Sequence, residues 1–340
     1  MAYQVFQVNK TGSTATVTFN PPFANPPVVI VMSSLIGGSS MGSVETVTAI
    51  STTGATIISG NQAPNYWVNV LAIDVDSPRI NELPVLVGSV PKTASTLQIP
   101  LSHDAPLPSV NLLSPFWIGS SQGVSDVDTL TDESDGGITV VSGNAATSGY
   151  NTQYLNAALC ADAGAQTGIV NKQGTIQRVY FTRSWPYPPI VFVSPWWNGG
   201  SGVGAKEFIR EVTTDYFDVM SGNNAQNYFD CWLAVPTPNN AFPTNLAGNW
   251  EVTIDGLSPN TGALTLSILS NGTLSPTATW NHTAGAQDVA VGWAQNQLSW
   301  VGPDHVYTGR LAGDVFNGTY CHPGRKRGSG NWTARQTTTK

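Results

Sequence analysis

The chain has 340 residues, of which only 10% are charged, and its formal net charge is −7. Its basic residues are scattered except at Arg325, Lys326 and Arg327, so it lacks the positive surface that nucleic-acid binding requires. It contains no run of about 18 apolar residues and no basic segment followed by an apolar one at its start. We therefore expect a soluble chain with no membrane insertion, no nucleic-acid partner and no classical signal peptide. Its location would be the cytoplasm, a virion, or outside the cell by a non-classical route.

A lysine and a downstream Ser-Gly-Asn tripeptide recur three times in the first 236 residues. The offset from the lysine to the serine is 49, 50 and 49 residues. The pairs are Lys10 with Ser59–Asn61, Lys92 with Ser142–Asn144 and Lys172 with Ser221–Asn223. Self-similarity at a fixed period indicates one structural unit used repeatedly. The sequence therefore predicts three tandem repeats, over residues 1–80, 81–165 and 166–236.

Within each repeat, an alternating strand is followed by a proline-containing turn and an apolar strand, at residues 15–34, 95–117 and 177–197. Alternation with period 2 buries one face of a strand, and the prolines hold the connection in an extended turn. A Gly- and Ser-rich loop, two more strands, a polar loop and a closing strand complete each copy. About six short strands in such a length are typical of a small antiparallel β-sandwich.

After a proline-rich linker at residues 237–244, the pattern changes to seven or so short alternating strands separated by Gly and Asn turns. This pattern of short strands and tight turns predicts a small up-and-down β-barrel over residues 245–340. Its layout, with Gly248 and Trp250 at the opening, is similar to that of avidin-type and lipocalin-type domains. Five tryptophans in this segment are candidates for its core or for a ligand pocket: Trp250, Trp280, Trp293, Trp300 and Trp332.

A shared motif in the first and third repeats resembles the H-type lectin domain. It comprises Val17, Phe19, Phe23, Pro26, Pro27 and Val29, repeated at Val179, Phe181, Trp185, Pro188, Pro189 and Val191, with a closing Trp232-Leu233-Ala234. The resemblance covers residues 3–236 and is weakest in the second repeat. It implies six-stranded sandwiches that assemble as trimers and bind N-acetylgalactosamine or galactose near subunit boundaries. Three copies on one chain would then form an intramolecular pseudo-trimer.

The loops that follow each Ser-Gly-Asn tripeptide are the candidate ligand sites. Sugars are held by directional hydrogen bonds to their hydroxyls and by aromatic rings against their C–H faces, and these loops supply both kinds of group. The candidate residues are Asn61, Gln62, Asn65, Tyr66, Asn144, Tyr150, Tyr154, Asn223, Asn224, Asn227 and Tyr228. The alternative is that they only form turns and pack on the sandwich rim. The aromatic residues Phe116, Trp117, Trp196 and Trp197 could likewise face a ligand or pack between repeats.

The sequence departs from the lectin pattern where the family carries a sugar-coordinating arginine, since Lys206 is the one basic residue in the corresponding loops. Sugar specificity therefore cannot be transferred. The four histidines are dispersed without zinc-ligand spacing, and the Gly- and Ser-rich stretches fall between predicted strands rather than before a helix, where a nucleophilic serine would need to lie. The acidic stretch Asp126, Asp128, Asp132, Glu133 and Asp135 suits either calcium or, more simply, a solvated acidic edge. Cys160 and Cys231 lie in apolar runs typical of buried free thiols.

These observations predict an all-β protein without catalysis, metal or cofactor. The first hypothesis for its function is a multivalent carbohydrate-binding protein that acts in glycan recognition or adhesion, with three linked sites raising the effective concentration at a glycan surface. The alternative is a structural or attachment component of a virion or extracellular assembly, in which the repeats serve as packing modules and the chain self-associates.

Overall fold

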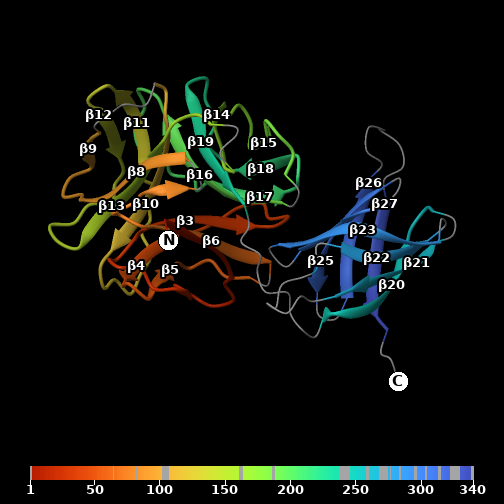
Figure 1. Ribbon diagram of the computed structural model, residues 1–340. Coiled ribbons are helices and arrows are strands. Elements are labelled where there is room, and N and C mark those ends of the chain that lie inside the picture. The colour runs from red at the N-terminus through yellow and green to blue at the C-terminus, as the bar shows by residue number, and fades with distance from the viewer. Residues whose placement is uncertain are drawn as a thin grey trace. The chain divides into compact units, whose positions relative to one another are not determined.

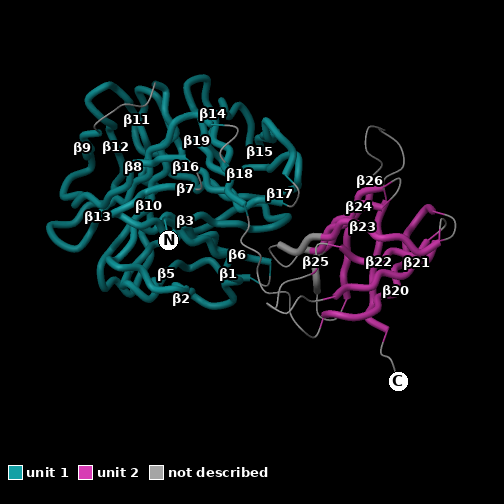
Figure 2. Tube along the Cα trace, in the orientation of Figure 1, with its two compact units in different colours: residues 1–236 teal, residues 237–340 magenta. Residues whose placement is uncertain are grey.

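The computed structural model of the protein describes residues 2–63, 65–80, 83–101, 107–160, 164–185, 188–236, 246–257, 260–267, 275, 277–282, 285–294, 297–302, 305–312, 315–321 and 330–337. Its regular elements are strands (Figure 1), so the predicted all-β class is confirmed. Two compact units, residues 1–236 and 237–340, are distinguished in Figure 2. The predicted linker at 237–244 lies outside the described residues. In the part of the chain that is described, no helix is long and apolar enough to cross a membrane.

The first unit holds three sets of six strands at corresponding places in the three repeats, as the sequence predicts. The first set is β1 Tyr3–Asn9, β2 Thr14–Thr18, β3 Val28–Leu35, β4 Thr46–Ile50, β5 Gly54–Ile58 and β6 Tyr66–Ile73. The second is β8 Leu83–Pro91, β9 Thr96–Pro100, β10 Val110–Trp117, β11 Thr129–Ser134, β12 Gly137–Val141 and β13 Tyr150–Ala157, preceded by the short β7 Arg79–Ile80. The third is β14 Gln166–Asn171, β15 Ile176–Tyr180, β16 Ile190–Trp197, β17 Phe208–Val212, β18 Tyr216–Met220 and β19 Tyr228–Val235.

The sheets of this unit cross the boundaries between repeats. Their strand orders are β1-β6-β3-β17-β18-β15, β2-β5-β4-β10-β13-β8-β7 and β14-β19-β16-β11-β12-β9. Each sheet therefore joins half of one repeat to half of the next through a parallel contact, at Ser34 with Ile209, Val47 with Phe116, and Leu130 with Trp196. The three joints form a closed cycle, which gives the pseudo-trimer, and each joint covers two strand edges that would otherwise be open.

Side-chain hydroxyls connect the central strands β3, β10 and β16 across the repeats. The Ser114 hydroxyl accepts the Val31 amide at 2.8 Å, and the Ser194 hydroxyl accepts the Leu113 amide at 2.8 Å. Both serines are buried, so each satisfies a backbone donor that no ladder reaches. The corresponding residue of repeat 1 is Met32, which has no hydroxyl to accept an amide N–H. The side-chain amide of Asn69 instead donates to a backbone carbonyl of repeat 3.

The second unit is a closed barrel of eight strands in up-and-down order. Its strands are β20 Gly248–Ile254, β21 Thr261–Leu266, β22 Thr277–His282, β23 Gly285–Ala294, β24 Gln297–Val301, β25 Val306–Ala312, β26 Val315–Cys321 and β27 Gly330–Gln336. The sequence suggested about seven strands because β23 and β24 read as one. Core packing is the role of Trp250, Trp280, Trp300 and Trp332, each 1% exposed, whereas the Trp293 side chain lies outside the described part.

Candidate functional site

A buried lysine explains the repeated anchor in each repeat. Lys10, Lys92 and Lys172 are 1%, 0% and 0% exposed, and burial lowers the pKa of each ammonium. Each ammonium donates to the backbone carbonyls of the serine and the asparagine of its own tripeptide, at 3.1, 3.1 and 3.2 Å to the serine oxygen. The constant sequence offset therefore reflects a fixed internal bond that closes each repeat.

A carboxylate completes this network, and the sequence did not single it out in this role. Glu45, Asp128 and Glu207 occupy equivalent positions just before β4, β11 and β17, and all are buried. Each accepts the tripeptide serine hydroxyl, at 2.5, 2.6 and 2.8 Å, and the hydroxyl of the first tyrosine of the closing strand, at 2.5, 3.0 and 2.5 Å. Burial raises the pKa of Asp128 and raises that of Glu207 to about 7.

The predicted acidic edge is therefore only partly correct. Asp132 and Asp135 are exposed, but Asp128 is 3% exposed and belongs to the internal network of repeat 2. Asp126 is half-buried. In the described residues no group of three or more His, Cys, Asp or Glu side chains could hold a metal ion.

Three of the four predicted tyrosines of the candidate loops are buried. Tyr66, Tyr150 and Tyr228 are 1%, 2% and 2% exposed, and burial raises the pKa of each phenol further above its usual range. Their hydroxyls donate to the internal carboxylates. Because the side chains are buried, neither face of these rings is open to a ligand. The reason is the strand register: the tyrosine begins the closing strand on the face that points into the sandwich.

The tripeptide asparagines fasten their turns to the Gly- and Ser-rich loops. The side-chain amide of Asn61 donates to the Ser43 carbonyl at 2.7 Å, that of Asn144 to the Asp126 carbonyl at 2.6 Å, and that of Asn223 to the Ala205 carbonyl at 2.8 Å. Asn61 and Asn223 also donate to the tyrosine hydroxyl of their repeat, each at 3.2 Å. Each asparagine therefore holds its turn against a neighbouring loop, and we call this set of contacts the loop clamp.

The other predicted residues are more accessible. Gln62, Asn65, Asn224 and Asn227 are exposed, and Tyr154 is half-buried, with its ring over Gly88 of the neighbouring strand. The Asn65 amide donates to the Ile36 carbonyl at 2.7 Å, and the Asn227 amide donates to the Asn198 carbonyl at 2.6 Å. These two asparagines thus hold equivalent loops in repeats 1 and 3.

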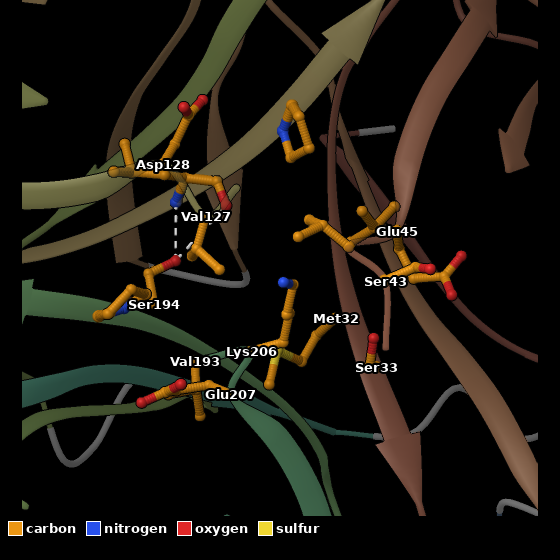
Figure 3. Close-up of a pocket in the computed structure, with 15 residues that line it drawn as sticks. Met32, Ser33, Ser43, Glu45, Val127, Asp128, Val193, Ser194, Lys206 and Glu207 are labelled. Carbon is orange, nitrogen blue, oxygen red and sulfur yellow. Dashed lines mark hydrogen bonds between the residues drawn. The ribbon is translucent and has the colours of Figure 1, made fainter. Parts of the chain in front are cut away.

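A small cavity of about 50 Å³ lies where the three repeats meet (Figure 3). Its lining repeats in triplets from the three repeats: Val31, Leu113 and Val193; Ser33, Pro115 and Pro195; Val44, Val127 and Lys206; and Glu45, Asp128 and Glu207. The three carboxylates point away from the Lys206 amino group, which donates to the Gly204 carbonyl at 3.0 Å. This volume holds water-sized groups and is too small for a sugar.

A larger groove of about 710 Å³ opens mainly on repeat 3, with Pro108, Leu159 and Cys160 of its lining contributed by repeat 2. Its lining comprises Pro108, Leu159, Cys160, Thr167, Gly168, Ile169, Thr182, Trp196, Asn198 and Phe229. The rings of Trp196 and Phe229 lie opposite each other on β16 and β19, with centroids 5.4 Å apart. Cys160, expected to be buried, is half-exposed here, whereas Cys231 is fully buried. Asn227, through its bond to the Asn198 carbonyl, fixes the loop that forms one wall of the groove.

A third depression, of about 300 Å³, lies at the boundary of repeats 2 and 3. It is formed by Ser142 and Gly143 of the second tripeptide and by residues 201–204 of the next repeat, with Asp126 beside them. This is where the resemblance placed a sugar. Its described lining contains no aromatic ring, which distinguishes it from the groove.

Comparisons of the chain with protein-family models, with curated proteins and with solved structures found no match. The functional argument therefore rests on the geometry of the repeats and of the groove.

Proposed function

We propose that the chain is a non-catalytic glycan-binding protein whose principal site is the repeat 3 groove. The observation that carries this proposal is the pairing of two half-buried aromatic rings, Trp196 and Phe229, with the exposed polar side chains of Thr182 and Asn198 in one open groove. Rings can stack on sugar C–H faces, while hydroxyl and amide groups can bond to sugar hydroxyls. The groove volume is within the range usual for small-ligand sites.

The aromatic pair is particular to repeat 3. The strand registers place Ser34 and Trp67 at the equivalent positions in repeat 1, and Phe116 and Asn151 in repeat 2. One ring of each pair is thus missing from the other two repeats. We therefore assign one principal site to each chain, and self-association of chains would supply multivalency.

The chemistry of the groove supports binding without catalysis. Its described lining contains no histidine, aspartate, glutamate, lysine or arginine. General acid–base catalysis requires a titratable group within hydrogen-bond reach of the substrate. The Cys160 thiol is the nucleophilic group of the lining, and none of the other lining side chains could serve as its base.

The test is glycan binding by the full chain and by two matched variants, Asn227→Ala and Asn65→Ala. Both replacements remove a side-chain bond to a loop carbonyl. Only the first loosens the wall that carries Asn198, and it also removes the acceptor of the Trp197 indole N–H at 3.2 Å. We expect Asn227→Ala to weaken binding by roughly fivefold or more and Asn65→Ala to leave it unchanged, because about 1 kcal/mol corresponds to a factor of five.

Replacement of Phe229 by Asn, the residue of repeat 2 at this position, tests the stacking surface itself. We expect binding to be lost or to fall by tenfold or more, with about 1–3 kcal/mol assigned to the ring. An array of galactose, glucose and acetamido sugars on which the unmodified chain binds nothing would contradict the proposal, as would equal losses in the two asparagine variants.

A second candidate function, assembly into a larger structure, is favoured by the outer face of repeat 3. Strand β15 is the edge of its sheet, and it exposes 44% of Ile176 and 69% of Tyr180. Between them, Arg178 stacks on Tyr216 at 3.7 Å. Open edges with apolar side chains are typical association surfaces. Size-exclusion chromatography with light scattering tests this candidate: assembly predicts oligomers that Tyr180→Thr disperses, and a concentration-independent monomer contradicts it.

A further inference from the structure

Repeat 3 contains a buried carboxyl group that the other repeats lack. Asp230 on β19 lies opposite Pro195, in the position that Val68 has in repeat 1 and Thr152 has in repeat 2. The aspartate is 0% exposed. The Thr152 hydroxyl donates to Asp128 at 2.8 Å and so supports the carboxylate of its repeat. An aspartate in this place can give Glu207 no such bond unless it carries a proton.

The described surroundings of Asp230 give its carboxyl group no hydrogen bond. Among the described residues neither of its oxygens has a hydrogen-bond partner. Its neighbours across the two ladders are Pro195, which has no amide hydrogen, and Val170. The facing residues of β18 include Phe217, whose ring packs at 5.6 Å from that of Trp232 on the same side of β19.

The titratable groups near Asp230 are Glu207, Lys172 and Tyr228, together with Cys231, the next residue of β19, whose side chain lies on the opposite face of the strand. Lys172 is already bonded to three backbone carbonyls, and Glu207 is bonded to hydroxyls and to Asn223. Repeat 3 therefore places two buried carboxyl groups beside one ammonium, where repeats 1 and 2 place one. A buried carboxylate without a donor or a counter-ion is strongly disfavoured, so such a group keeps its proton.

We infer that Asp230 gives repeat 3 a second buried carboxyl group and that the Asp230 and Glu207 pair retains a proton in the folded chain, so that Asp230 makes the stability of this repeat fall as the pH rises. Burial, followed by the charge of Glu207, raises the pKa of Asp230 well above its usual range, in agreement with the geometry. Because β19 also carries Phe229, release of this proton would loosen one wall of the groove. The stability effect itself does not depend on what the groove binds.

The direction of the pH effect follows from linkage. Aspartate in the unfolded chain has a pKa of about 4, so the unfolded state releases its proton first as the pH rises. The contribution to stability is therefore complete below about pH 4 and is lost as the pH rises through the higher folded pKa. Over that interval each retained proton shifts the folding equilibrium by up to tenfold per pH unit.

The test compares unfolding of the full chain from pH 4 to 9 with that of Asp230→Thr and Asp230→Val, which install the residues of repeats 2 and 1. We expect the folding equilibrium constant of the unmodified chain to fall relative to both variants by up to tenfold per pH unit above about pH 4. Val68→Thr, a change at the same position of repeat 1 that removes no ionisable group, serves as the control and should keep the profile of the unmodified chain. Parallel profiles for all four proteins would overturn the inference.

A direct measurement covers the case in which the variants fail to fold. In the unmodified chain labelled with ¹³C at aspartate carboxyl carbons, we expect the resonance assigned to Asp230 to stay at its protonated position well above pH 4, the pKa of an aspartate in the unfolded chain. Carboxyl resonances that all complete their titration below about pH 5 would refute the inference.

Discussion

Repeats 1 and 3 share one internal framework and differ in what is added to it. Both close on a buried lysine, a carboxylate, a serine and a tyrosine in the same hydrogen-bond arrangement. Repeat 3 adds Asp230 beside its carboxylate and the Trp196–Phe229 pair beside its groove, where repeat 1 has Val68 and the pair Ser34 and Trp67. The comparison teaches that the polar network specifies the sandwich, while single positions on the closing strand set the chemistry of each copy.

The largest expected effect is the removal of a lysine from this framework. Lys92→Met removes the charge of this ammonium from the surroundings of the buried Asp128 and removes its bonds to three backbone carbonyls, those of Ala94, Ser142 and Asn144. We expect a loss of about 3–5 kcal/mol in the free energy of unfolding, because each buried acceptor left without its donor costs about 1–3 kcal/mol. Chemical denaturation measures it. Lys206→Met, a half-buried lysine bonded to one carbonyl, is the control and should stay within about 0.5 kcal/mol.

The tyrosine hydroxyls sharpen the comparison of the two repeats. Tyr228→Phe removes one donor from Glu207, which still accepts from Ser221 and Asn223 but lies near a second carboxyl group. Tyr66→Phe removes one donor from Glu45, which keeps the Ser59 hydroxyl and has a lysine 3.8 Å away. Leaving a buried acceptor without its donor costs about 1–3 kcal/mol. We expect the loss of thermal stability at pH 8 to be greater for Tyr228→Phe. A greater loss for Tyr66→Phe would show that Asp230 does not make Glu207 more dependent on its hydrogen-bond donors.

The smallest effect concerns the loop clamp. Asn223→Gly keeps the turn flexible enough to form but removes the side-chain bonds to the Ala205 carbonyl, the Tyr228 hydroxyl and the Glu207 carboxylate. We expect a cost of about 1 kcal/mol from lost hydrogen bonding. The adjacent exposed residue gives the matched control, since Asn224→Gly should change the melting temperature little. Equal, small effects for both variants would mean that the asparagine only shapes the turn.

The candidate site was predictable only in its outline. The aromatic Trp196 and the exposed Asn227 were singled out from the sequence, and the structure places both around the groove, Trp196 in its lining and Asn227 behind the loop that bears Asn198. Tyr66 and Tyr228 carry the same sequence signal, yet they are buried, because the facing of a strand residue depends on which side the partner sheet covers. Phe229 and Thr167 carried no separate signal, since groove walls are assembled from distant segments.

By itself the sequence determined three repeats of about six strands, the lysine-to-tripeptide register and a C-terminal up-and-down barrel. These follow from period-2 alternation, turn residues and fixed spacing, which are local properties of the chain. The tertiary structure decided that the sheets pass from one repeat into the next and that Glu45, Asp128 and Glu207 close the buried networks. It also decided that Asp230 has no hydrogen-bond partner among the described residues. These features depend on contacts between residues that are far apart in the chain. The local sequence pattern is compatible with several arrangements of the strands, and side-chain packing and the need to hydrogen-bond buried polar groups select one of them.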